Sequence, residues 1–133
     1  MAVARAEQRV RKPSEYTRIQ QGGARVGTRH FVLILAAQAL TPGPTRLGIT
    51  ASRKIGNAVA RNRAKRLVRE AFRATPELFA PGIDVVVIVR KPVGMARLAE
   101  IIDEWRQAAP ALRRTMAGLL AAREEARKTG HGA

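Results

Sequence analysis

The residues best suited to chemistry in this sequence are basic, and they gather between positions 53 and 73. Arg61, Lys65 and Arg69 are spaced four residues apart, which places them on one face of a helix. Guanidinium forks bind phosphate oxygens in pairs, and an ammonium group binds them as a point charge. Because like charges at this spacing destabilise an isolated helix, we expect an external polyanion to neutralise them.

The same segment carries a separate apolar stripe, which predicts a helix from Ala58 to about Thr75. Its small and aliphatic residues recur at helical spacing and indicate a packed side. Eight positive charges face one negative charge between positions 52 and 73. A run of two or three basic residues is usually only a solvated face, but this density favours nucleic-acid binding, without choosing between DNA and RNA. The stripe comprises Ala60, Ala64, Leu67, Val68 and Ala71, and Asn62, Arg66 and Arg73 lie beside the basic row.

Composition supports the same interpretation. The chain has 133 residues, 25 of them Lys or Arg against ten Asp or Glu, with a formal net charge of +15. A membrane surface is the competing polyanion, but no apolar run approaches the ~20 residues needed to span a bilayer, and the first eight residues lack the apolar core of a signal peptide. We therefore expect a cytoplasmic protein without a membrane partner. No obligate protein partner is predicted.

Candidate catalytic and metal-binding groups are few. Cysteine is absent, which excludes disulfides, thiol catalysis and cysteine-ligated zinc. His30 and His131 are too far apart to indicate a metal site. Asp84, Asp103 and Glu104 are too scattered to predict a magnesium site, because that ion needs clustered oxygen ligands. The sequence therefore predicts neither a catalytic residue nor a metal ligand on the protein itself.

The remaining pattern predicts one domain of mixed α/β class. Runs rich in β-branched residues predict strands at 30–35, 46–52 and 83–89. Ser14 is the expected N-cap of a short helix over 15–21, and further helices are expected over 95–108 and 110–128. Prolines around Gly43 predict a loop at 41–44. We expect a flexible basic segment at 1–12, a single domain at 13–128 and a loose tail at 129–133.

The stretch from Arg46 to Phe72 closely resembles the signature of bacterial ribonuclease P proteins. It contains Arg46-Leu47-Gly48-Ile49, Ser52-Arg53-Lys54-Ile55-Gly56-Asn57-Ala58-Val59 and Arg61-Asn62-Arg63-Ala64-Lys65-Arg66-Leu67-Val68-Arg69-Glu70-Ala71-Phe72. Flanking features agree in order and spacing: Arg11-Lys12 before Tyr16, Gly22-Gly23 before Arg29-His30-Phe31-Val32-Leu33, and Gly82-Ile83-Asp84-Val85-Val86. The resemblance covers roughly residues 9–108.

This resemblance implies an α/β sandwich, in which helices pack against a small central sheet. The same resemblance implies a left-handed βαβ crossover, although such crossovers are generally right-handed. It also implies the protein subunit of a ribonucleoprotein that removes the 5′ leader from precursor tRNA. The partners would be the ribonuclease P RNA and precursor tRNA. Hydrolysis would take place on the RNA subunit, with magnesium held by that RNA and the substrate. A general RNA-binding or ribosome-associated protein is the alternative that composition alone leaves open.

The resemblance also assigns roles to individual residues. Gln20 and Ile34 depart from family positions that often carry aromatics, which predicts weaker stacking and more dependence on charge. Tyr16 on a short amphipathic helix has ordinary core packing as its alternative role, and Phe31, Phe72 and Trp105 are expected in the core. The residues matching a cleft for the leader are Tyr16, Val32, Thr50, Arg61, Lys65 and Arg69. Those matching the surface for the RNA subunit are Arg53, Lys54, Asn62, Arg63 and Arg66.

Overall fold

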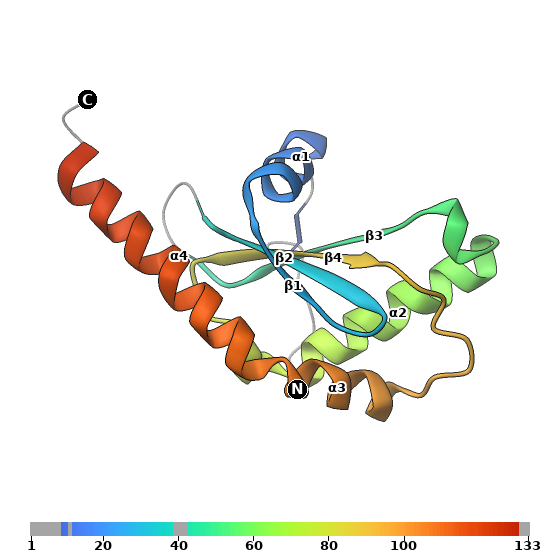
Figure 1. Ribbon diagram of the computed structural model, residues 1–133. Helices are drawn as coiled ribbons and strands as arrows, with labels where there is room; N and C mark the ends of the chain where they lie inside the picture. Colours follow the sequence, from blue (N-terminus) through green and yellow to red (C-terminus); the bar gives the residue numbers. More distant parts are fainter. Residues whose placement is uncertain (1–8, 11, 39–42, 131–133) are drawn as a thin grey trace.

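A four-stranded sheet forms the centre of the protein (Figure 1). The computed structural model describes residues 9–10, 12–38 and 43–130. The strand order is β1-β2-β4-β3, with β2 antiparallel to both neighbours and β3 parallel to β4. The strands are β1 (Ala24–Gly27), β2 (Phe31–Ala37), β3 (Arg46–Ala51) and β4 (Ile83–Val89).

Helices cover both faces of the sheet, which gives the expected α/β sandwich (Figure 1). Helix α1 lies on one face, and α2, α3 and α4 lie on the other. Because parallel neighbours need a long crossover, α2 connects β3 to β4 in a βαβ unit. The hand of this crossover stays an expectation from the family resemblance. The helices are α1 (Pro13–Gly22), α2 (Ala58–Ala74), α3 (Leu98–Gln107) and α4 (Ala109–Gly130), with short 3₁₀ turns η2 (Arg53–Ile55) and η3 (Pro76–Leu78).

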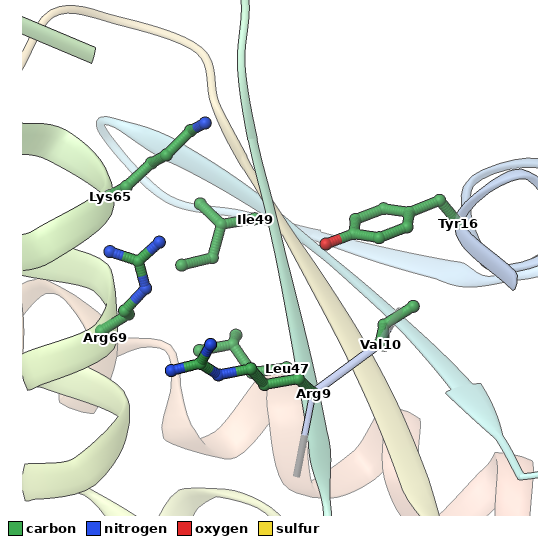
Figure 2. A pocket seen from close by; sticks show the side chains of 7 residues that line it. All are labelled: Arg9, Val10, Tyr16, Leu47, Ile49, Lys65 and Arg69. Carbon is green, nitrogen blue, oxygen red and sulfur yellow. The ribbon is translucent and has the colours of Figure 1, made fainter. Parts of the chain in front are cut away.

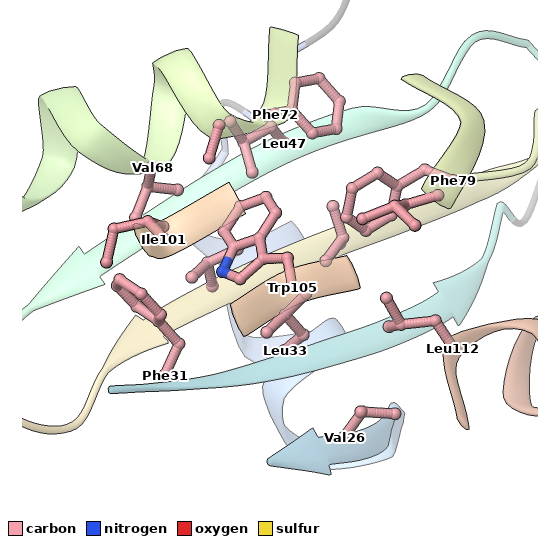
Figure 3. Close-up of a cluster of buried hydrophobic side chains, with 14 of the residues drawn as sticks. Val26, Phe31, Leu33, Leu47, Val68, Phe72, Phe79, Ile101, Trp105 and Leu112 are labelled. Atoms are coloured by element: carbon pink, nitrogen blue, oxygen red, sulfur yellow. The ribbon is translucent and has the colours of Figure 1, made fainter. Parts of the chain in front are cut away.

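The larger hydrophobic core lies between the sheet and α2, α3 and α4 (Figure 3). Trp105 of α3 is wholly buried at its centre. Its indole contacts Phe31 and Phe79 edge to face, with ring centroids 6.1 and 5.9 Å apart. Phe72 is also buried in this core. The predicted core roles of Phe31, Phe72 and Trp105 are therefore confirmed.

A smaller core lies beneath α1 on the opposite face. Ile19 of α1 packs there against Ile34 of β2 and Val86 of β4, and all three are fully buried. Ile34, one of the two departures from the family's aromatic positions, is covered by α1 and does not line an accessible surface. Tyr16 and Val32 are only partly buried at the edge of this cluster.

The structure corrects several predicted boundaries. Helix α1 begins at Pro13 with Lys12 rather than Ser14 as its N-cap, because proline suits the first helical position and Glu15 Oε1 accepts the Lys12 N–H at 3.2 Å. Helix α3 begins three residues later than predicted, after Gly94, whose φ of 56° lies in the left-handed region. Helix α4 includes residues 129 and 130, which were expected in the tail.

The packed part of the chain begins before residue 13, where the domain was expected to start. Arg9 forms a parallel bridge with Leu47, and Val10 is only 4% exposed. These two residues were assigned to a flexible segment because their polar neighbours resemble an unfolded arm. Residues 1–8, 11 and 131–133, and positions 41–42 of the predicted loop, lie outside the described residues. The packed part of the chain therefore includes Arg9 and Val10.

Glu104 ties α3 to the turn between β1 and β2. Its carboxylate accepts hydrogen bonds from the Thr28 hydroxyl at 2.6 Å and the His30 backbone N–H at 2.8 Å, and its other oxygen lies 2.7 Å from His30 Nδ1. Burial alone would raise the pKa of Glu104, but these hydrogen bonds outweigh burial and hold the pKa below its ordinary value of 4.5. The ionised carboxylate therefore stabilises the fold.

We expect Glu104→Gln to reduce the free energy of unfolding by about 1 to 3 kcal/mol at pH 7, the usual value of hydrogen bonds to a charged group. A carboxyl with a lowered folded-state pKa contributes fully above its ordinary pKa, and that contribution is lost as pH falls through the folded value. The difference in the free energy of unfolding between wild type and variant should therefore become smaller below about pH 4.5. Urea unfolding at a series of pH values measures it, and a gap independent of pH would contradict this role.

Candidate nucleic-acid interface

Helix α2 is positioned by a defined start and an apolar side. The Asn57 side chain accepts the Ala60 N–H at 2.9 Å and so caps the first turn. Gly56, just before it, has φ of 142°, a conformation that L side chains rarely adopt. Ala64, Leu67, Val68 and Ala71 are buried, as the stripe predicted, and Ala60 is partly buried. The basic side chains are consequently turned away from the sheet's centre.

Arg61, Lys65 and Arg69 follow one side of α2 and are each partly exposed. Within the described residues, no carboxylate lies within ion-pair distance of any of them. The predicted row of cations is therefore present in the folded protein and forms no ion pair with another residue in that part of the chain.

A cleft of about 260 Å³ separates α2 from α1 along the edge strand β3 (Figure 2). Lys65 and Arg69 extend from the α2 side, and Tyr16 extends from α1 on the other side of the strand. Arg9 lies close to Leu47 and adds a third cation. Val10, Leu47 and Ile49 complete the lining. The cleft thus combines an aromatic ring, an apolar floor and a cationic wall.

Gly48 allows the Tyr16 ring to lie directly against β3. A Cβ at position 48 would be only 2.7 to 3.0 Å from three atoms of the Tyr16 side chain, closer than real Cβ contacts. The ring therefore occupies space that any other residue at position 48 would fill. Tyr16 is partly exposed and also packs against the smaller core, so its ring is accessible from the cleft while it contributes to packing.

A second hollow, of about 350 Å³, adjoins the first and shares Tyr16 and Ile49 with it. Its lining also includes Gln20 and Thr50, together with Pro13. Thr50 is the register partner of Ile88, which in turn pairs with Val32. The structure thus brings Tyr16 and Thr50 together, with Val32 on the same face two strands away. Arg61 lines neither hollow and lies one helical turn before Lys65.

The residues predicted to face the RNA subunit form a neighbouring surface. Arg53 and Lys54 are exposed on η2, and Asn62 and Arg66 are exposed on α2. Arg63 differs from them because it is partly buried and its Nη2 donates to the Ala96 carbonyl at 2.8 Å. Arg63 therefore ties α2 to the loop before α3 as well as contributing charge.

Sequence reasoning missed an ionic network beneath α1. Asp84 of β4 is fully buried and accepts hydrogen bonds from Arg46 Nε at 2.8 Å and Arg46 Nη2 at 2.7 Å. Arg18 Nη2 and Gln38 Nε2 also donate to it, at 3.2 and 3.1 Å. The third nitrogen of Arg46 lies 3.0 Å from Glu15 Oε2. The only sequence signal was the place of Asp84 within an apolar strand, where a carboxylate needs partners.

The pKa of Arg46 is raised above its ordinary value, chiefly by its hydrogen bonds to Asp84. Desolvation opposes this effect, and Glu15 adds to it. The guanidinium is therefore charged at every accessible pH. The network acts as a permanent ionic connection between α1 and the sheet.

The family model described as Ribonuclease P matches residues 4–113. The chain belongs to the ribonuclease P protein family. It is 39% identical over 97 residues to the ribonuclease P protein component of Syntrophus aciditrophicus, covering 73% of this chain and 80% of the relative. It is 40% identical over 93 residues to that of Geobacillus kaustophilus, covering 70% and 76%. All of the predicted site residues lie within the part matched by the ribonuclease P model.

Solved ribonuclease P proteins share this fold. The Staphylococcus aureus protein aligns with a TM-score of 0.67 and 30% identity over 81% of this chain and 96% of that chain. The Thermotoga maritima protein aligns with a TM-score of 0.66 and 28% identity over 76% and 94%. The chain is thus the protein subunit of ribonuclease P, an endoribonuclease complex with an RNA partner, and its family processes the 5′ leader of tRNA. In the described part, none of the helices is long and apolar enough to cross a membrane.

Proposed function

We propose that the cleft between α1 and α2 binds the single-stranded 5′ leader of precursor tRNA. The observation that carries this proposal is the Tyr16 side chain lying against Gly48, across β3 from Lys65 and Arg69. An aromatic platform beside a cationic groove is the usual arrangement for single-stranded nucleic acid. Thr50 and Val32 extend the surface across the sheet, and Arg61 extends the cationic wall by one turn.

The outer surface formed by Arg53, Lys54, Asn62 and Arg66 is proposed to bind the ribonuclease P RNA. Its side chains are exposed, and arginine and asparagine suit a structured RNA surface with phosphates and base edges. Arg63 adds positive charge beside this surface and also binds the loop before α3. One helix would thus contact two RNA molecules on adjacent faces. We place this assembly in the cytoplasm.

Phosphodiester hydrolysis is proposed to take place on the RNA subunit, with magnesium held by that RNA and the substrate. The buried carboxylate of Asp84 and the partly buried carboxylate of Glu104 already accept hydrogen bonds from arginine, glutamine, threonine and histidine residues. They do not fit a protein-held magnesium site, since that ion needs available oxygen ligands and keeps several waters. The protein's own contribution is to bind and orient RNA.

Cleavage of precursor tRNA at low magnesium tests this function. A bacterial ribonuclease P RNA is assayed with and without the purified protein, together with the protein alone. We expect removal of the 5′ leader only when RNA and protein are both present. Cleavage by nuclease-free protein alone would contradict the assignment of chemistry to the RNA. RNA binding that never promotes cleavage with several bacterial ribonuclease P RNAs would contradict the proposed role in the assembly.

Tyr16→Ala is expected to weaken binding of leader-containing precursor by roughly 5- to 150-fold, because stacking on an aromatic is worth about 1 to 3 kcal/mol per base. Binding of mature tRNA should change far less. Dissociation constants of the reconstituted holoenzyme for the two RNAs measure the difference. Tyr16→Phe, which keeps the ring, is the matched control. Equal losses for both RNAs would return Tyr16 to a packing role.

A further inference from the structure

We propose that Arg46 is a positioning residue for leader recognition: it holds α1, and through α1 the Tyr16 ring, at a fixed distance from the cationic wall of α2. This inference rests on the proposed leader site and adds a second layer of residues to it. Arg46 lines neither hollow, so it acts through α1 rather than by contact with the leader.

Two ionic contacts connect α1 to this part of the sheet, one on each side of Tyr16 in the sequence. Glu15, one residue before it, pairs with Arg46 at 3.0 Å. Arg18, two residues after it, pairs with Asp84 at 3.2 Å. Arg46 and Asp84 are themselves register partners on β3 and β4. Both contacts therefore end at a single Arg46–Asp84 pair.

All three nitrogens of the Arg46 guanidinium are used. Nε and Nη2 form a fork on the two oxygens of Asp84, and Nη1 binds Glu15. Such a fork fixes orientation as well as distance. The Asp84 side chain is 0% exposed, whereas those of Arg46 and Glu15 are 25% and 26% exposed. The buried half of the network is thus anchored in the sheet, and the partly exposed half reaches the helix.

Apolar packing alone leaves α1 less well defined. Its one fully buried residue is Ile19, and hydrophobic contacts are not directional. The Tyr16 ring lies in the space that a Cβ at position 48 would occupy. A small rotation of α1 would therefore move Tyr16 off Gly48 and change the width of the cleft. The contact between Arg46 Nη1 and Glu15, held in orientation by the fork of Arg46 on Asp84, opposes that rotation.

Arg46→Lys tests the proposal because lysine keeps the charge but cannot form the fork and the third contact together. The measured quantity is the leader ratio, the dissociation constant of the holoenzyme for mature tRNA divided by that for leader-containing precursor. We expect Arg46→Lys to lower this ratio by about 3-fold or more. In a Tyr16→Ala background it should have no further effect, because the group being positioned is gone.

Glu15→Gln is the milder second variant, and it carries the test if Arg46→Lys does not fold. Glutamine at this position can still accept the N-cap N–H, but it loses the ion pair with Arg46. It should lower the leader ratio in the same direction and by a smaller factor. If Tyr16→Ala lowers the leader ratio in the same assay and Glu15→Gln leaves it unchanged, the positioning role is overturned.

Two controls separate positioning from stability. Arg106→Lys makes the same substitution in an exposed ion pair with Glu77, and Glu104→Gln breaks a buried carboxylate network involving α3 on the opposite face. Both should leave the leader ratio unchanged. Equal losses for precursor and mature tRNA in Arg46→Lys, or additive effects with Tyr16→Ala, would overturn the proposal. A leader ratio unaffected by Tyr16→Ala would instead overturn the leader site itself.

Discussion

Replacement of Arg61, Lys65 and Arg69 together by alanine is expected to flatten the salt dependence of precursor tRNA binding. Each cation that neutralises a phosphate on a single strand contributes about 0.7 to the slope of log affinity against log salt, so three contribute roughly 2. As salt rises from ~0.05 to ~0.2 M, the ratio of the variant's dissociation constant to that of the wild type should therefore fall by roughly 16-fold. Precursor dissociation constants for the wild-type and variant holoenzymes across this range measure it.

A matched variant removes three exposed cations from α4 instead: Arg113, Arg114 and Lys128. It lowers the net charge equally but leaves the cleft intact. We expect it to keep most of the wild-type salt slope. Alanine favours helix at the α2 positions, so the fold should survive, which circular dichroism would check. An equal loss of slope in both variants would assign the effect to overall charge rather than to the cleft.

Trp105→Ala is expected to cost about 3 to 5 kcal/mol in the free energy of unfolding, the usual loss for a buried large aromatic. The indole is fully buried and contacts Phe31 of β2 and Phe79 after η3 edge to face. Its removal leaves a cavity between α3 and the sheet. Urea unfolding should show a lower midpoint with an unchanged slope, because the surface exposed on unfolding is nearly the same.

Trp105→Phe tests how much of this loss comes from removing the aromatic ring. Trp105 Nε1 is buried without a hydrogen-bond partner among the described residues. Phenylalanine removes that unsatisfied donor while keeping an aromatic ring, so we expect a much smaller loss than for alanine. A loss as large as that of Trp105→Ala would show that a phenyl ring does not fill the space of the indole, and would contradict this expectation.

The most local patterns were the most predictable. The predicted strand over 83–89 is β4, and the predicted helix over 58–75 is α2, one residue shorter. Both are long enough for periodicity and residue type to agree. Strand β1 was missed because it has four residues, an exposed Arg25 and a terminal Gly27. Such a short edge strand is defined by its pairing with β2 rather than by its own composition.

The candidate site was predicted unevenly for the same reason. Lys65 and Arg69 share one helix face by spacing alone, and the structure places them at a cleft. Their relation to Tyr16 could not be derived, because that residue comes from another helix and reaches the site over Gly48. The burial of Ile34 beneath α1 could not be derived either, because nothing in its strand indicates that a helix covers it.

The sequence by itself determined the charge of the protein, its basic helix, its strongest strand and its family. Each of these depends on residues that are neighbours along the chain, where spacing fixes geometry. Only the tertiary structure decided that Arg46 and Asp84, 38 residues apart, form one ion pair, and that Arg18, 66 residues from Asp84, joins it. Contacts between distant residues depend on strand register and helix packing, because these bring together side chains whose separation in sequence carries no periodic signal.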